Sequence, residues 1–412
     1  MILHFGTKNK PQPKITQPVP SLTQKQIITL RANELANFSW KPIEPTYPKW
    51  GSTYFATELQ RGIPYSSTRG IGRTIGRDIS FYTFLTALKN PLSRVYTEDL
   101  RTQDGDYYVN AHTAAGFYGM VCSEFLAHVY DLDIVPASIQ FTTYPGAKVR
   151  AIQSANAVEV GDFLHRPGHV ALVSDVNRAY GTIQSITVAE ATSPVVKLTT
   201  YSPAEFNNRL RTDTLYSFDL PHELTFTPFE YPANYNSFIG LDRGDKTNYV
   251  KDKEPVRFNI MDERVDKLTI TKDGITIETI LVASPGVVER TYSESGLYKA
   301  YCTLNDSSIT DSVEFMVASV VNDTQPSAIT LGQSVTVNFS AEGCEPSYIM
   351  VRDAPPVYGY ADFLPHLLTE TEKSQGYAEI RPTTTGEFVT SVVGKNEFGH
   401  VYSNLETLIV NE

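Results

Sequence analysis

The chain has 412 residues, of which 41% are hydrophobic and 20% charged, and its formal net charge is −11. This length and composition predict a folded protein of two to four domains. The acidic balance, without a basic tract, argues against a nucleic-acid partner. No apolar run approaches membrane-spanning length, and no signal peptide is visible at the N-terminus. Three cysteines without CxxC or HExxH spacing lead us to expect no metal site and no cofactor.

The first half of the chain is predicted to contain helices first and strands afterwards. Residues 1–20, rich in Pro, Lys, Gln and Thr, are expected to form a flexible arm. Apolar residues at helical spacing predict three helices, over 21–38, over 78–90 and from Cys122 onward. From about residue 158, short β-type runs are separated by Gly, Pro and Asn. We therefore expect residues 21–220 to form an α+β domain with helices packed on an antiparallel sheet.

The second half of the chain is predicted to be all-β. Residues 221–249 are expected to be a linker. Apolar and polar residues then alternate in two blocks, 250–322 and 323–412, each of the size of a small β-sandwich. Within them, GLYKAYCTLND and GEFVTSVVGKNEFG resemble the G-x-Y stretch of immunoglobulin-like domains, although the partner cysteine pattern and a central Trp are missing. We expect two immunoglobulin-like modules, with a surface ligand as a possible partner.

Cys122 is the candidate catalytic residue of the first half. It stands where a helix is predicted to begin, and the unpaired N–H groups and dipole of a helix start favour a negative sulfur. The alternative is that Cys122 is a small buried residue of the hydrophobic core, without a catalytic role. A nucleophile needs a base, and among the nearby histidines only His169 begins an apolar strand that could fix its ring. On the next strand Glu190 is a lone carboxylate that could orient this base through Nδ1–H.

Five stretches in order, RGIPYSS, YGMVCSEFLAHVY, VEVGDF, GHVALVSD and VAEAT, resemble the NlpC/P60 superfamily of papain-like cysteine peptidases. The resemblance covers about residues 25–215. It implies a papain-like fold that cleaves or transfers amide bonds, most often in peptides of the bacterial cell wall. It also implies Cys122 as nucleophile, His169 as base and Glu190 at the third polar site, and an extracellular or wall-associated location.

Three further residues are expected to contact substrate. Tyr65 follows the turn proline where the family often places a tyrosine beside the cysteine, and Ser123 keeps the family's residue after the nucleophile. Val121 stands where many members have an aspartate that binds the free amine of the wall peptide. This replacement favours an amidase or acyltransferase with a non-wall substrate as an alternative to a wall peptidase. A binding protein that has lost its chemistry is the remaining alternative.

Overall fold

The structure is a computed structural model of the chain. It describes residues 22–45, 57–66, 74–77, 79–90, 93, 96, 119–132, 135–220, 222–231, 239–241, 247–310, 312–353 and 366–412. The arm expected at residues 1–20 lies outside the described residues. So do residues 97–118, which precede the helix that begins at Cys122.

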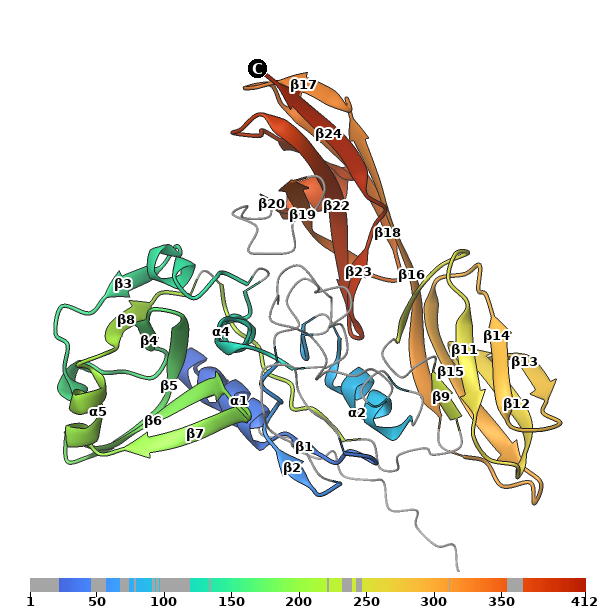
Figure 1. Cartoon of the computed structure of the whole chain (residues 1–412), viewed down its shortest axis with the longest axis horizontal. Coiled ribbons are helices and arrows are strands. Elements are labelled where there is room, and N and C mark those ends of the chain that lie inside the picture. Colours follow the sequence, from blue (N-terminus) through green and yellow to red (C-terminus); the bar gives the residue numbers. More distant parts are fainter. Residues whose placement is uncertain are drawn as a thin grey trace, which may run out of the picture.

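A six-stranded antiparallel sheet dominates the N-terminal half, with the strand order β3-β8-β4-β5-β6-β7 (Figure 1). Its strands are β3 (Ala147–Val149), β4 (Phe163–Arg166), β5 (His169–Ala179), β6 (Thr182–Thr192), β7 (Val195–Tyr201) and β8 (Thr214–Phe218). Successive side chains of a strand point to opposite faces. In β5, Val170 and Leu172 enter one hydrophobic core, whereas Ala171 and Val173 enter another. Both faces of the sheet are therefore covered.

Helices contribute further residues to these two cores. The helical and short paired segments of this half are α1 (Gln24–Asn37), β1 (Ser39–Trp40), β2 (Gln60–Arg61), α2 (Phe81–Lys89), α4 (Cys122–Val129), η1 (Gln140–Thr143), η2 (Ala155–Ala157) and α5 (Pro203–Arg209). The first core contains buried residues of α1, α2 and α4, and the second contains Phe206 of α5 and Ala155 of η2. Thr23 precedes helix α1, and its side chain accepts a hydrogen bond from the Gln26 amide, a capping interaction that stabilises the first turn.

Where the structure describes it, the C-terminal half is all-β apart from one short helix. Its elements are β9 (Ile239–Leu241), β10 (Asn248–Val250), β11 (Val256–Ile260), β12 (Val265–Lys272), β13 (Ile275–Leu281), β14 (Gly286–Arg290), β15 (Gly296–Leu304), β16 (Val313–Gln325), β17 (Ala328–Thr330), β18 (Val335–Glu342), β19 (Glu345–Asp353), β20 (His366–Leu367), α6 (Glu370–Gln375), β21 (Tyr377–Ile380), β22 (Gly386–Asn396), β23 (Gly399–Tyr402) and β24 (Glu406–Asn411). Among the described residues, no helix of the chain is long and apolar enough to cross a membrane.

These strands form two β-sandwiches. In the first, β14-β11-β9 faces β13-β12-β15-β16, and both sheets contribute to one core that includes Phe258 and Phe315. In the second, β18 and β21 face β19 and β22, and Val337 and Val392 lie in their common core. The expectation of an all-β C-terminal half is confirmed.

Strand β16 joins the two sandwiches without a loop. Residues 313–317 pair with β15, and residues 319–325 pair with β18. The boundary expected between residues 322 and 323 therefore falls inside a continuous strand, and the change from one core to the next occurs near Ala318. The burial pattern changes phase at this point: Val313, Phe315 and Val317 lie in the first core, whereas Met316, Ala318 and Val320 lie in the second.

The described parts of residues 221–249 belong to the structured halves on either side, rather than forming the linker that we expected. Leu224 is buried in the first core of the N-terminal half. Strand β9 pairs with β11, and β10 runs parallel to β16. Helix α2 of the N-terminal half also contacts the C-terminal half, because the Tyr82 hydroxyl accepts a hydrogen bond from the Glu314 amide of β16 at 3.1 Å.

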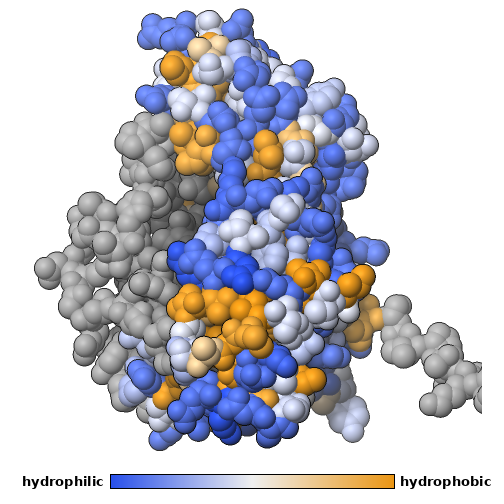
Figure 2. Space-filling model, turned by 90° about the vertical axis from the view of Figure 1, so that its right-hand side faces the viewer, coloured by the Kyte–Doolittle hydropathy of each residue, from blue (hydrophilic) through white to orange (hydrophobic). Residues whose placement is uncertain are grey.

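Hydrophobic side chains gather on the outer face of the first sandwich, which Figure 2 views from the right-hand side of Figure 1. The exposed apolar residues of β13 and β14 are Ile275, Ile277, Leu281 and Val287. Strand β13 is an edge strand of its sheet. This face is the most evident apolar surface of the β modules in that view.

Candidate active site

Cys122 is the first residue of helix α4, as the sequence predicted. Phe125, Leu126 and Val129 of this helix are fully buried in the first core and anchor it beside β5 and β6. The backbone before the helix is fixed as well, because Met120 pairs with Tyr65 in an isolated bridge. Cys122 thus lies at a helix start, where the first N–H groups have no partner within the helix.

The turn between β4 and β5 brings a histidine to this sulfur. The Sγ of Cys122 lies 4.0 Å from the carbonyl oxygen of Gly168, and the next residue is His169. Burial alone would disfavour the charged imidazole. Hydrogen bonds and charge attraction from Cys122 and Glu190 outweigh it and raise the pKa of His169 to about 9. The structure therefore brings the expected nucleophile and base together.

Glu190 of β6 completes the constellation. Its Oε2 lies 2.8 Å from His169 Nε2, and only 8% of the residue is exposed. Burial favours the neutral carboxyl, but the partners His169 and Arg209 prevail and lower its pKa to about 2. The expected use of Nδ1 is wrong: Nε2 faces the carboxylate, which leaves Nδ1 for the sulfur. The ring enters from the start of β5, and this direction could not be read from the sequence.

Arg209 is a site residue that sequence reasoning missed. It ends α5, and its guanidinium donates to Glu190 Oε2 at 3.1 Å. Its Nε donates to Asp213 at 2.9 Å. The only sequence signal was the spacing of four residues between Arg209 and Asp213, which is typical of a helical ion pair and does not point to Glu190.

Two of the three expected substrate contacts lie next to the nucleophile in the chain. Ser123 is 5% exposed, and Val121, the residue before the helix, is half-buried. The Val121 amide donates to the buried carboxylate of Glu124 at 2.7 Å, and Thr74 donates to the other oxygen of this carboxylate at 3.0 Å. This acid was also missed. It stabilises the helix start and its two oxygens are engaged in doing so.

Tyr65, the third expected contact, lies beside the segment that leads to Cys122. Its amide donates to the carbonyl of Pro194 at 2.8 Å, and its side chain is partly buried against the first core. The backbone bridge to Met120 therefore places Tyr65 close to the helix start, while its role toward a substrate stays a prediction.

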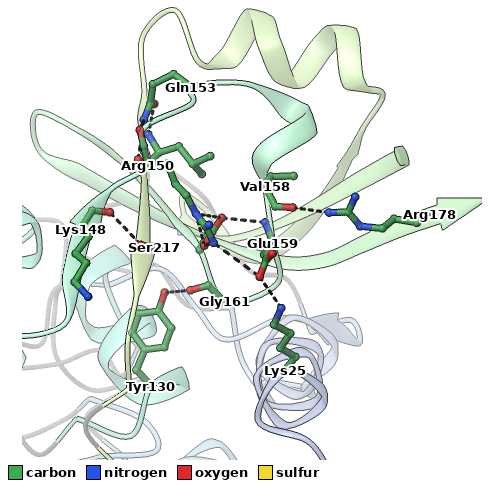
Figure 3. Close-up of polar contacts among 12 residues, drawn as sticks. Lys25, Tyr130, Lys148, Arg150, Gln153, Val158, Glu159, Gly161, Arg178 and Ser217 are labelled. Carbon is green, nitrogen blue, oxygen red and sulfur yellow. Dashed lines mark hydrogen bonds and ion pairs between the residues drawn. The ribbon is translucent and has the colours of Figure 1, made fainter. Parts of the chain in front are cut away.

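The VGDF turn, one of the stretches that carry the family resemblance, is held by ion pairs (Figure 3). Arg150 contacts Asp162 through two nitrogens, the shorter distance being 2.6 Å. Asp162 also accepts the Glu159 amide at 2.9 Å, and Glu159 pairs with Lys25 of α1 at 2.7 Å. This cluster ties α1 to the sheet and engages both oxygens of Asp162, which favours a structural role. Within the described ranges, no three His, Cys, Asp or Glu residues are grouped as a metal site.

No family model and no curated protein matches the chain. Solved structures that share some similarity include the fibronectin(III)-like modules of Clostridium thermocellum CbhA, with 12% identity over 40% of this chain and 88% of theirs, at a TM-score of 0.20. A C-terminal fragment of intimin in complex with the translocated intimin receptor shares 13% identity over 42% of this chain and 63% of the fragment, at a TM-score of 0.27. The ectodomain of mouse nectin-like molecule 4, Ig1–Ig3, shares 9% identity over 42% of this chain and 64% of the ectodomain, at a TM-score of 0.16.

These neighbours are immunoglobulin- and fibronectin-like all-β modules. The chain spans less than two thirds of the intimin fragment and of the nectin-like ectodomain. Their TM-scores are too low to support an argument about function or a finer fold assignment. The description of the C-terminal half as two β-sandwiches rests on its sheet order and cores. The papain-like, NlpC/P60-type assignment of the N-terminal half stays a prediction from its motifs.

Proposed function

We propose that the N-terminal half is a cysteine amidohydrolase of NlpC/P60 type that acts through Cys122, His169 and Glu190. The observation that supports this most is the contact between three elements. A cysteine at the start of α4 interacts with a histidine of β5, and the ring of this histidine lies 2.8 Å from a buried carboxylate of β6. Such a set supplies a nucleophile, a base and an orienting group.

In the proposed reaction the Cys122 sulfur, as thiolate, attacks the amide carbonyl and forms a C–S bond. The protonated His169 then donates its proton to the departing nitrogen, and the C–N bond breaks to leave a thioester on Cys122. Water then attacks the thioester carbonyl while His169 accepts its proton, the C–S bond breaks to return the Cys122 thiolate, and the carboxylic acid is released. A raised pKa of His169, about 9, supports the proton-donor role because the ring stays protonated near neutral pH.

We propose a peptide as the substrate, with peptides of the bacterial cell wall as the first candidate class. Val121 is the observation that favours the second candidate, an amidase or acyltransferase on a non-wall substrate. Its hydrocarbon side chain cannot accept a hydrogen bond from an ammonium group, so a free amino terminus would find no partner at this position. The β modules would then serve as spacers or as docking surfaces for a ligand. The third candidate function is that of a binding protein without catalytic activity.

The test is turnover of a panel of peptidoglycan fragments and N-acetylated peptides by the full chain, with mass spectrometry of the protein to detect the thioester. We expect Cys122→Ala to abolish turnover and His169→Ala to reduce kcat on the order of 10⁴-fold or more, since nucleophile and base act as one unit. Cys344→Ala is the matched control, because that thiol lies in the second sandwich. Turnover that survives Cys122→Ala would exclude the proposal.

A further inference from the structure

Glu190 shares its carboxylate between two cations that come from different elements. His169 of β5 contacts Oε2 at 2.8 Å. Arg209 of α5 contacts the same oxygen at 3.1 Å and Oε1 at 3.4 Å. Both oxygens are therefore engaged, and the plane of the carboxylate is determined by the guanidinium as well as by the imidazole.

Arg209 is itself held on its other side. Its Nε donates to Asp213 Oδ2 at 2.9 Å, and one terminal nitrogen donates to the Tyr201 hydroxyl of β7 at 2.8 Å. The side chain of Arg209 is 11% exposed and that of Asp213 only 1%. The rigid fork of an arginine can meet acceptors in three directions at once, whereas the single nitrogen of a lysine cannot reproduce this geometry.

The buried charges alternate in sign up to the nucleophile, in the order Asp213, Arg209, Glu190 and His169. Such a row stabilises each member, since every buried charge has an opposite neighbour. Other charged or titratable groups near the row are Arg166 of β4, whose nitrogen lies 3.8 Å from Asp213, His165 of β4, and Lys197, the cross-strand partner of Glu190 on β7.

We infer that Arg209 is a positioning residue: it fixes the Glu190 carboxylate so that Oε2 faces His169 Nε2 and the ring presents Nδ1 to Cys122. This inference rests on the proposed function, because positioning matters only if Cys122 and His169 react. The guanidinium of Arg209 contacts Glu190, Asp213 and Tyr201, so it acts on the nucleophile through Glu190. Its charge also keeps Glu190 ionised, because a cation beside a buried carboxyl favours the anion.

The experiment is a double-mutant cycle between Arg209 and Glu190 in the full chain. The readout is the rate of Cys122 alkylation by iodoacetamide at pH 7, mapped by mass spectrometry. We expect Arg209→Met to slow alkylation by about 10–100-fold, the range for a lost alignment of reacting groups. In a Glu190→Gln background the same change should alter the rate by less than about twofold, because the path through Glu190 is already broken.

A pH profile provides the second readout. Without the guanidinium, Glu190 takes up a proton at higher pH, so the acidic limb of the Arg209→Met profile should move to higher pH than in the wild type. In the Glu190→Gln background no such movement is expected. Arg211→Met is the matched control: it removes an exposed arginine two residues away and should leave both the rate and the profile unchanged.

Equal losses in both backgrounds would overturn the inference, because they would mean that Arg209 only holds α5 in place. An unchanged rate in Arg209→Met would overturn it as well. If this variant does not fold, Arg209→Lys decides, since it keeps the charge without the fork; a wild-type rate there contradicts positioning, and a loss supports it. A wild-type Cys122 that reacts no faster than Cys344 would instead contradict the proposed function itself.

Discussion

The thiols of the two halves of the molecule lie in opposite surroundings. Cys302 is fully buried in the core of the first β-sandwich, and burial raises its pKa to about 12. Cys344 contacts the core of the second sandwich, and burial raises its pKa to about 11. Cys122 is almost as buried, at 6% exposure, yet it lies at a helix start beside a protonated histidine. Burial raises the pKa of a thiol where no cation lies beside the sulfur to favour the thiolate.

The largest expected effect is a difference in alkylation between these thiols. Native protein treated with iodoacetamide at pH 7.5 should modify Cys122 at least about 10³-fold faster than Cys302, because a thiol with a raised pKa in an apolar core carries almost no thiolate. Mass mapping over time gives the three rates. Denatured protein is the control, since all three should then react alike. Equal, slow labelling of the native protein would remove the contrast between the halves.

Replacing the carboxylate that holds His169 should have a smaller effect. We expect Glu190→Gln to lower kcat by about 10²-fold. A glutamine oxygen can still accept the Nε2–H but no longer stabilises the imidazolium, and its amide nitrogen would face the Arg209 guanidinium. Glu205→Gln on α5 is a control, since the exposed side chain of this acid accepts a hydrogen bond from the Ser202 amide at the start of its own helix. A loss as large as that of His169→Ala would mean that the ring had turned away.

His169 also links the site to stability. Its pKa is about 9 in the folded chain, against an ordinary value of 6.5, so the folded state holds the proton more tightly. The stabilisation is fully present below pH 6.5, falls as the pH rises through about 9 and is absent above it. We expect wild type to lose about 3 kcal/mol relative to His169→Ala between pH 6 and pH 10. Urea unfolding at both pH values measures it, and a constant difference would contradict the ion pair.

Local patterns predicted most elements and the members of the site. Apolar spacing indicated α1, and the order of motifs was enough to select Cys122, His169 and Glu190. The role of Arg209 was not predicted because Arg209 and Glu190 are 19 residues apart and lie on different elements. The periodicity of the sequence does not encode such a contact.

Sequence patterns also did not predict how neighbouring parts of the chain are joined. Residues 222–231 have little regular structure, yet Leu224 is buried against the first core. The backbone there is ordered by side-chain burial, which composition does not reveal. Strand β16 is a second case: the apolar run FMVA, residues 315–318, accompanies the change of core, but it does not reveal that the two ends of the strand pair with different strands. Pairing partners depend on long-range topology, whereas alternation reports only that a strand is present.

The smallest expected effect concerns specificity at Val121. An aspartate there could pair with the amino terminus of a peptide, and as the residue before α4 it would also lie in the favourable field of the helix start. The buried carboxylate of Glu124, which already binds the amide of residue 121, opposes a second negative charge. We therefore expect Val121→Asp to raise kcat/KM for peptides with a free amino terminus by only about fivefold over their acetylated forms, the value of a partly exposed ion pair.

Val121→Asn separates charge from capping, because asparagine can cap the helix without attracting an ammonium group. The preference for free amines should appear in Val121→Asp and be absent in Val121→Asn, with both variants as stable as the wild type to within about 1 kcal/mol. If the two variants share the same preference, the charge at position 121 does not select the substrate. The hydrocarbon of Val121 would then not be the reason for a departure from wall peptides, and the non-wall candidate would lose its support, whereas the roles of Cys122 and His169 would be unaffected.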